Sequence, residues 1–589
     1  MPRPTQLASA TESSSTHAVP IAVRHPAGYA GSMRALWLLF TCLIASPAFA
    51  LSPCGGDAIV PTQVIEGTFS SSIEGAYVMV PFDVPPGTTQ VRVKYCWDKP
   101  ESGSMSHTID LGLWDARPIG GTSGGIWGPK QFRGWGGSSH PDVTITRQGF
   151  STEAQYLARP RGHVPGRTQR GFLPGKIKAG EWAAELGVAA VISTAEGDAT
   201  GEVRWRVEIA LSSDPAFAAE RYRAKRYDRK PAIREARWYA GDMHVHAEHS
   251  ALGDATMRET FDYAFRPLAA GGAGLDFITL SDYVTRSAWG EIGRFQKSYP
   301  GKLIVRSSEV ITYRGHTNNH ASVHTVDHRR GPVYERAADG TLTLLRPPTP
   351  PRDLFAEVHA HGGWTQINHP TIFPPSTPGF ARLCRGCAWS YTADETDFSQ
   401  VDAIEIQTGP ALLGTFPNPF TATAIEFYEA ALAAGNHVAA VGSSDSHDAG
   451  RVDDAFGAPI GHATTVVFAN ELSERGVRNA VQAGHTYVKL LGNDGPDLRL
   501  EAATKGKPAI MGDTVGGNFA EMTATVLNVP PGATATLAVV RDGVTIETVP
   551  VTPPALVHQF TAFGPGRYRL ELRGSNFVWA LTTPIWVVQ

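Results

Sequence analysis

Two short strings of histidine and aspartate have the residue types and the spacing to hold a metal ion. The first reads Asp-Met-His-Val-His and ends at His246, and the second reads Ser-Asp-Ser-His and ends at His447. Side chains at positions i and i+2 of an extended strand point to the same side. His244 and His246 are therefore expected to point to one place, and so are Asp445 and His447. Imidazole and carboxylate groups suit zinc, manganese or iron. The strings therefore predict the metal site of a metallohydrolase.

The segment around these strings predicts an α/β domain. Apolar runs, interpreted as buried strands, alternate here with helix-length segments, and polar residues follow four of these strands, namely Asp282, Glu309, His369 and Asp445. The catalytic and binding residues of parallel α/β folds lie at the carboxyl ends of the strands. The predicted strands are 276–280, 303–306, 364–367, 401–406 and 437–441. The predicted helices are 256–268, opened by a capping box at Thr256 and Glu259, then 351–361 and 421–434.

The regions on either side predict β-sandwiches, because short alternating runs are separated there by glycine and proline turns. Such runs occur at 77–80, 90–95 and 202–207, and again at 523–526, 536–540 and 568–572. The predicted organisation is an extension with a signal peptide (1–50), an N-terminal sandwich (51–235), a central domain (236–494) and a C-terminal immunoglobulin-like sandwich (495–589).

Composition and leader point to an exported protein. An apolar run behind Met33 and Arg34 ends in Ala48-Phe-Ala50, which predicts a secretory signal over about 33–50 and a protein of the periplasm or medium, with no permanent membrane span. The four cysteines behind it predict two disulfides, one distant pair and one close pair, which are Cys54 with Cys96 and Cys384 with Cys387. A net charge of −4 over 589 residues, without a long basic run, argues against a nucleic-acid partner.

Taken together and in order, the motifs of the central segment resemble those of the PHP (polymerase and histidinol phosphatase) superfamily. The residues that carry the resemblance are Asp242-x-His244-x-His246, Asp282, Glu309 with Gly315-His316, Ile367-Asn-His369-Pro370 and Ser444-Asp445-Ser446-His447. The segments 132–135 and 483–487 are similar to the secreted carbaryl-hydrolase-like branch of that superfamily. The resemblance implies a distorted (β/α)7 barrel between the two sandwiches.

The resemblance also implies a ligand set for one or two divalent ions, Zn²⁺ or Mn²⁺, with Fe²⁺ as a further option. The matching residues are His244, His246, Glu309, His316, His369, Asp445 and His447. The family has one more ligand shortly after the first motif, where this chain offers His249 and Asp254, and Asp254 is preferred. Without the family pattern, the polar stretch 315–320 that holds His316 is interpreted as a loop, and Pro370 favours extended backbone at His369.

One position departs from the family pattern. The second motif normally reads Thr-Asp-His, whereas this chain has Ser-Asp-Tyr, ending at Tyr283. A phenol is a poor neutral ligand, although a metal could hold it as phenolate, so one or two metals are expected and not a third. The alternative role for Tyr283 is to donate a hydrogen bond to the developing oxyanion of the substrate. The candidates that would protonate the leaving group are His447, His320 and Tyr283.

Three functions compete. Hydrolysis of phosphomonoesters or phosphodiesters by metal-activated hydroxide is favoured, because it is the commonest chemistry of the superfamily and suits paired metals. Hydrolysis of carboxylic esters or carbamates is the alternative suggested by the carbaryl-hydrolase-like branch. A non-catalytic protein that binds a glycan or a surface partner through a degenerate barrel is the third. The expected substrate is a small-molecule ester or one linked to a lipid or glycan.

Overall fold

The computed structural model describes residues 51–99, 106–117, 126–160, 162–377, 379–380, 382–452, 457–504 and 507–589. The predicted signal peptide at 33–50 lies outside these residues. No helix within the described ranges is long and apolar enough to cross a membrane. Both predicted disulfides are confirmed, one joining Cys54 to Cys96 and one joining Cys384 to Cys387.

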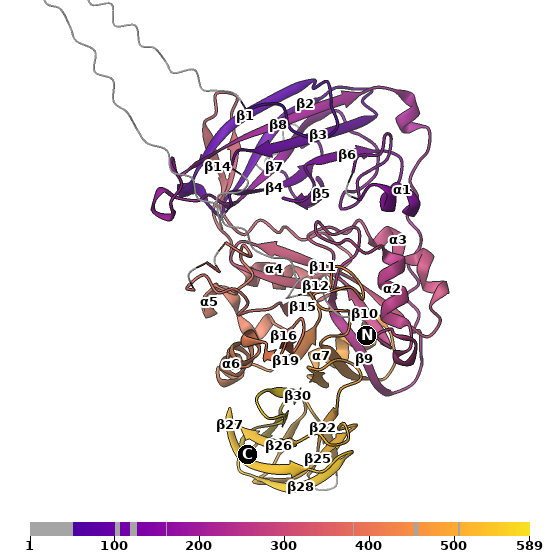
Figure 1. The fold of residues 1–589 in the computed structure, drawn as a ribbon, viewed down its shortest axis with the longest axis vertical. Coiled ribbons are helices and arrows are strands. Elements are labelled where there is room, and N and C mark those ends of the chain that lie inside the picture. Colours follow the sequence, from indigo (N-terminus) through magenta and orange to yellow (C-terminus); the bar gives the residue numbers. More distant parts are fainter. Residues whose placement is uncertain are drawn as a thin grey trace, which may run out of the picture. The chain divides into compact units, whose positions relative to one another are not determined.

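Two sheets build the N-terminal region; Figure 1 draws their strands in indigo and purple, except for β13 and β14, which are salmon. Their inward residues alternate along each strand and form one core that includes Val93, Leu111, Trp182 and Val207. The first sheet has the order β1 (Gln63–Ser70), β8 (Glu202–Ser212), β3 (Gln90–Trp97), β6 (Asp142–Thr146). The second has the order β14 (Leu342–Arg346), β13 (Val333–Arg336), β2 (Tyr77–Val84), β7 (Gly180–Ala190), β4 (Thr108–Trp114), β5 (Phe132–Gly137). A short helix, α1, spans Glu153–Ala158.

The hairpin β13–β14 belongs to this second sheet although it lies far along the chain. Strand β13 pairs in parallel with β2, with Val333 opposite Tyr77. The segment 236–494 therefore lends two strands to the N-terminal sheets, a feature that the predicted boundaries do not contain.

Seven strands form a ring in the central segment. Their order is β9 (Arg237–Val245), β10 (Phe277–Leu280), β11 (Leu303–Thr312), β12 (Gly315–His320), β15 (Trp364–Ile367), β16 (Ala403–Thr408), β19 (Ala439–Ser443). Neighbouring strands run parallel, except that β12 is antiparallel to both of its neighbours. The ring closes just beyond β19, where Asp445 N–H donates to the carbonyl of His244 at 3.0 Å and His246 N–H donates to that of Ser446 at 2.9 Å.

Helices follow some of these strands. The helices are α2 (Met257–Phe265), α3 (Trp289–Phe295), α4 (Pro351–Ala360), α5 (Ala393–Thr396), α6 (Pro419–Ala433) and α7 (Glu474–Gln482). The capping box at Thr256 and Glu259 is confirmed, but α2 ends before Pro267 and not at Leu268 as predicted. Strand β11 turns directly into β12 through Tyr313 and Arg314, so no helix separates these two strands. The class of distorted (β/α)7 barrel stays a prediction.

The stretch 315–320, interpreted from sequence as a loop, is the buried strand β12, and that interpretation is wrong. The side chains of His316, Asn318 and His320 have hydrogen-bond partners, whereas the side-chain amide of Asn319 is buried with no partner among the described residues. The amide of Asn318, for example, donates to the carbonyl of Met243 at 3.0 Å. A polar strand can be buried when its groups are hydrogen-bonded in this way.

The C-terminal strands continue the sheet of the ring. From β9 the sheet passes through β20 (Thr464–Ala469) and β21 (Thr486–Lys489) to β30 (Val578–Thr582), β29 (Gly566–Arg573), β26 (Ala535–Arg541) and β27 (Val544–Val551), with β31 (Ile585–Val588) and β24 (Thr514–Gly516) beside it. A second sheet has the order β23 (Lys507–Ile510), β22 (Asp497–Thr504), β25 (Phe519–Leu527), β28 (Leu556–Phe563). The two share a core that includes Leu498, Met522, Leu537 and Leu570. A two-stranded hairpin, β17 (Leu412–Leu413) with β18 (Phe416–Pro417), follows β16.

Candidate metal centre

Five of the predicted ligands meet the Glu309 carboxylate inside the ring. His244 and Glu309 lie on β9 and β11, His316 lies near the start of β12, and His246, His369 and Asp445 follow β9, β15 and β19. The carboxyl ends of parallel strands meet at one edge, and the antiparallel β12 brings its amino end to the same place. The structure divides these residues into two sets that both include Glu309.

The first set consists of His244, His246, Glu309 and Asp445. The Nε2 atom of His244 lies 3.1 Å from Glu309 Oε2 and 3.2 Å from Asp445 Oδ1. The Nε2 atom of His246 lies 3.4 Å and 3.0 Å from the same two oxygens. Ligands bound tetrahedrally at 2.0–2.1 Å are separated by about 3.3 Å, so these four atoms have the spacing of a zinc-type site.

The second set consists of Glu309, His316 and His369. The other carboxylate oxygen, Glu309 Oε1, lies 3.2 Å from His316 Nδ1 and 3.2 Å from His369 Nε2. The side-chain amide of Asn368 donates to the same oxygen at 3.1 Å. Glu309 therefore offers one oxygen to each set, which is the geometry of a carboxylate that bridges two cations.

The hydrogen bonding of this centre fits a cation better than it fits a structural network. Glu309 is 1% exposed and His244 is fully buried. Both ring nitrogens of His244, and Oε2 of Glu309, nevertheless have no hydrogen-bond partner among the described residues, although they lie at ion-pair distance. Buried polar atoms without partners are costly in a folded protein, and convergence on a shared point is what metal ligands require.

The electrostatics agree with this geometry. Burial alone would lower the pKa of His244, but the carboxylates of Asp445 and Glu309 raise it well above its ordinary value. Burial alone would raise the pKa values of the two carboxyl groups, but the neighbouring histidines hold both well below the ordinary range. The centre thus holds two anionic carboxylates, the buried one of Glu309 and the partly exposed one of Asp445, which attract positive charge.

A loop closed by a disulfide positions two of the histidines. The ring of His316 hydrogen-bonds through Nε2 to the carbonyl of Arg385 at 3.3 Å, and the ring of His369 through Nδ1 to the carbonyl of Cys387 at 3.2 Å. A carbonyl can only accept, so these nitrogens donate. In a neutral imidazole the opposite nitrogens, which face Glu309, would then be free to bind a cation. The Cys384–Cys387 disulfide closes the loop that supplies both carbonyls. Such contacts orient ligands and fix their tautomers.

Sequence reasoning missed Glu405, the partner of His244 on its other side. The carboxylate of Glu405 is fully buried and lies 3.4 Å from His244 Nδ1. It also accepts from the backbone N–H of His369 at 2.6 Å. Glu405 lies on β16, whose strand was predicted, so the strand-end rule that selected Glu309 could have selected Glu405 as well.

The backbone is strained at two of the ligands. His369 has a φ of 28° and Asp445 a φ of 54°, in the left-handed region that residues other than glycine avoid. The prediction of extended backbone at His369 is wrong. The hydrogen bonds that His369 makes with Glu405 and Cys387 hold the strained conformation, which costs about 1–3 kcal/mol and is typical of functional sites.

Tyr283 and His447 lie together beside the first set. The hydroxyl of Tyr283 lies 3.2 Å from His447 Nε2, and the ring of His447 stacks on that of His246 with centroids 4.2 Å apart. Burial, with the charges of Glu309 and Asp445, raises the pKa of Tyr283 well above its ordinary value, so its phenol keeps its proton. His447 does not belong to either ligand set, although its Nε2 atom lies 3.6 Å from Asp445 Oδ1. Its roles as a ligand and as a proton donor stay predictions.

Two predicted residues are not brought to the centre. Asp254 is exposed and does not belong to either ligand set; it follows Gly253 in a turn where its own N–H bonds to the carbonyl of His447. His320 is fully buried between Ser307 and Gln366, at 3.0 Å and 3.3 Å from its two ring nitrogens. Because β12 is antiparallel, His320 lies about 13 Å along the strand from His316, at about 3.3 Å per residue, toward the amino ends of the parallel strands.

Two motif aspartates, Asp242 and Asp282, are not predicted ligands and instead accept hydrogen bonds from backbone N–H groups. The carboxylate of Asp242 accepts from the N–H groups of His244, Ser444 and Gly461 at 3.1, 3.2 and 2.8 Å, which ties the first string to the second. Asp282 accepts from the N–H of Ala247 at 2.8 Å. Both aspartates therefore fix the loops that carry the ligands.

Comparison with known proteins adds little to this geometry. No protein-family model matches the chain, and no curated protein matches it. Among solved structures, the chain is similar to a two-domain protein from Bacteroides vulgatus containing a predicted PHP-like metal-dependent phosphoesterase, at 18% identity and a TM-score of 0.32, covering 62% of this chain and 98% of that one. An engineered protein matches at 12% identity and a TM-score of 0.14, covering 54% and 49%. Neither similarity is strong enough to argue for a fold or an activity.

Proposed function

We propose that this chain is a metal-dependent hydrolase of ester bonds, and specifically a phosphoesterase that uses metal-activated hydroxide. The observation that carries the proposal is the division of the Glu309 carboxylate between two sets of histidine and carboxylate ligands. Divalent ions bound there would lower the pKa of a bound water to near neutrality and polarise the bond under attack. Two ions close together suit a phosphoryl group, which offers an oxygen to each.

The residues of the chain have separable tasks in this proposal. His244, His246 and Asp445 would hold one ion and His316 with His369 the other, with Glu309 between them. Glu405 and the 384–387 loop orient the histidines.

Tyr283 and His447 are the pair placed to hold a proton near the leaving group, because the Tyr283 hydroxyl lies 3.2 Å from the His447 ring beside the first set. His320 has no such task, because its ring nitrogens are occupied by Ser307 and Gln366.

The two disulfides support the further proposal that the mature protein works outside the reducing cytoplasm, in the periplasm or medium. The substrate class proposed is a small-molecule ester or one linked to a lipid or glycan.

A side-by-side assay tests the function. The purified chain is offered bis-p-nitrophenyl phosphate, p-nitrophenyl phosphate and 1-naphthyl N-methylcarbamate, before and after chelation and after metal is restored. We expect turnover of a phosphate ester that chelation abolishes and metal restores. Turnover of the carbamate alone would favour the carbaryl-hydrolase alternative. Absence of chelator-sensitive turnover on all three would favour a binding protein.

A further inference from the structure

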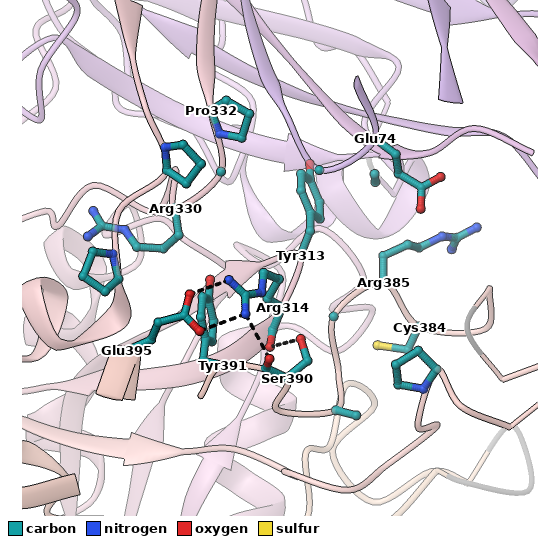
Figure 2. A pocket seen from close by; sticks show the side chains of 18 of the residues that line it. Glu74, Tyr313, Arg314, Arg330, Pro332, Cys384, Arg385, Ser390, Tyr391 and Glu395 are labelled. Atoms are coloured by element: carbon teal, nitrogen blue, oxygen red, sulfur yellow. Dashed lines mark hydrogen bonds and ion pairs between the residues drawn. The ribbon is translucent and has the colours of Figure 1, made fainter. Parts of the chain in front are cut away.

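A second site of unusual charge lies on the far side of the disulfide loop. A cavity of about 620 Å³ opens between the N-terminal sheets and the segments 313–314, 330–332, 348–352 and 382–391 (Figure 2). None of the candidate metal ligands, all of which the structure describes, lines this cavity. The side chain of Arg385 lines it, whereas the carbonyl of Arg385 bonds to His316. The loop thus separates the cavity from the metal centre.

The cavity carries a positive charge that its own residues do not neutralise. Five arginines line it, which are Arg314, Arg330, Arg352, Arg382 and Arg385, against two glutamates, Glu74 and Glu395. Glu395 pairs with Arg314 at 2.7 Å and Glu74 pairs with Arg382 at 2.7 Å. For the other three arginines, no carboxylate within the described part of the chain lies at ion-pair distance.

Two of these unpaired arginines are poorly hydrated. Arg330 is 6% exposed, and its Nε atom has no hydrogen-bond partner among the described residues, while one Nη atom donates to the carbonyl of Asp327. Arg385 donates to Ser106 Oγ at 3.0 Å, and its Nε atom is likewise buried without a partner. Burial lowers the pKa of both guanidinium groups. Arg330 is buried and Arg385 is half-buried, and the carboxylates that act on them, Asp327 on Arg330 and Asp110 on Arg385, are not at ion-pair distance. A poorly hydrated cation without a paired anion is costly, so these side chains are suited to an anion from outside the chain.

A helix adds to the positive potential. Helix α4 begins at Pro351, and residues 348–350 and 352, at its amino end, line the cavity. The N–H of Thr349 bonds to the carbonyl of Arg330 at 2.9 Å, which places Arg330 beside this helix start. The hydroxyl of Thr349 is buried without a partner among the described residues. Helix amino ends attract anions, and here the effect coincides with an unpaired arginine.

We propose that this cavity is a binding site for an organic dianion. One anionic group, a carboxylate, sulfate or phosphate, lies against Arg330 and the start of α4, and the second lies against Arg385. The carbon skeleton between them contacts the apolar lining, which includes Tyr313, Tyr391 and Phe373. The two anionic groups would supply the charge that neither Glu74 nor Glu395 provides.

Isothermal titration calorimetry with benzene-1,3-disulfonate tests the site, because this dianion has no hydrolysable bond and is a weak chelator. We expect one equivalent to bind the full chain, and Arg330→Gln and Arg385→Gln each to weaken binding at least tenfold, since each loses a charge-assisted hydrogen bond. Arg223→Gln, which removes an exposed arginine outside the cavity, is the matched control and should bind as wild type does. Arg385→Gln is the second variant should Arg330→Gln unfold, as judged by circular dichroism.

Absence of binding by the wild-type chain would overturn the proposal, and so would wild-type affinity in both cavity variants. His244→Ala separates this site from the metal centre. Binding that survives His244→Ala and chelation supports an independent anion site, whether or not the chain is a hydrolase. Binding that disappears with either would mean that the anion sits on the metal, and would overturn the site.

A further experiment, which rests on the proposed function, tests whether the dianion is part of the substrate or a separate molecule. If the dianion is part of the substrate, the disulfonate will inhibit hydrolysis of an aryl phosphate that carries a second anionic group, competitively with that substrate. If it is a separate molecule, inhibition or activation will be non-competitive. In either case the effect should be absent in Arg385→Gln, and an effect of equal size in that variant would count against the site.

Discussion

Two buried histidine–carboxylate clusters in this molecule differ in how their polar atoms are satisfied. In the first, the candidate metal centre, His244 and Glu309 approach to 3.1 Å without a hydrogen bond. In the second, between the N-terminal sheets and the central segment, His328 bonds to Glu185 at 2.8 Å, and Trp114 donates to the other oxygen of Glu185 at 2.6 Å. Both glutamates are essentially fully buried.

The second cluster continues to the ion pairs of Asp327, in which the Nε atom of Arg346 is buried with no partner among the described residues. Arg329, which is fully buried, bonds through two nitrogens to both oxygens of Asp327 at 2.9 and 2.8 Å, and Arg346 adds a bond of 2.8 Å. The guanidinium of Arg329 also lies over Trp114 at 3.9 Å. The comparison teaches that residue type and burial alone do not distinguish a candidate metal site from a structural ion pair. The two clusters differ in whether the facing histidine and glutamate atoms are hydrogen-bonded to each other.

The largest predicted difference is in activity. Glu309→Gln removes the charge that both ligand sets share, so we expect hydrolysis of the phosphate substrate to fall at least about 10³-fold, because metal-bound water loses its activation. The matched variant Glu185→Gln alters the second cluster and should keep kcat within a few-fold of wild type while lowering Tm. Equal losses of kcat in the two variants, measured under conditions where both are folded, would contradict the proposed difference between the two clusters.

A stability measurement tests the second cluster. Asp327→Asn leaves Arg329 buried without its anion, so we expect the free energy of unfolding at pH 7 to drop by about 3–5 kcal/mol with metal content unchanged. Denaturant unfolding checks the first expectation and metal analysis the second. A loss of bound metal in this folded variant would show that the two clusters are not separate.

The same carboxylate predicts a pH dependence. Burial alone would raise the pKa of Asp327, but Arg329 and Arg346 hold it well below its ordinary value of 3.8. A folded-state pKa below the unfolded one contributes stability above the unfolded value, and that stability is lost as pH falls below about 4. The difference in unfolding free energy between wild type and Asp327→Asn should therefore shrink from pH 5 to pH 3. A difference that stays constant over this range would contradict the assignment.

A smaller effect is expected at the disulfide loop. Replacing Cys384 and Cys387 together by serine frees the loop whose carbonyls orient His316 and His369, so we expect metal affinity to weaken about 10–100-fold. Replacing Cys54 and Cys96 together is the matched control, since that bond lies in the N-terminal region, and it should change Tm without changing metal affinity. Competition with a chromophoric chelator measures both.

The smallest effect is expected at Tyr283. Tyr283→Phe removes the hydroxyl beside His447 and leaves both ligand sets intact, so kcat should fall about tenfold, the size of one hydrogen bond to a charged group, with metal content unchanged. Metal analysis and steady-state kinetics on the same preparation check the two expectations. A change in metal content would mean that Tyr283 is itself a ligand.

Local signals in the sequence were sufficient for several elements and for most residues of the candidate metal centre. The predicted strand 364–367 is β15, and the capping box at Thr256 opens α2, because such patterns depend on neighbouring residues alone. His244 and Asp445 were selected by their i, i+2 spacing and by their strand ends, and the ring brings them together.

The remaining features depend on long-range contacts that leave no local pattern. The hairpin β13–β14 joins a sheet whose partner strand lies more than two hundred residues away. The polar strand β12 has no apolar alternation, and side chains such as Asn318 and His320 are hydrogen-bonded to neighbouring strands. His320 was selected by residue type, and only the antiparallel register with β11 shows that it faces Ser307 and not the metal centre.

Metal analysis of the full chain by plasma mass spectrometry tests the central claim most directly. After reconstitution with Zn²⁺ or Mn²⁺, wild type should hold up to two ions per chain, His244→Ala and His369→Ala should each hold fewer, Glu309→Gln the fewest, and Glu185→Gln as many as wild type. Equal metal content in Glu309→Gln and wild type, with both folded, would contradict the account.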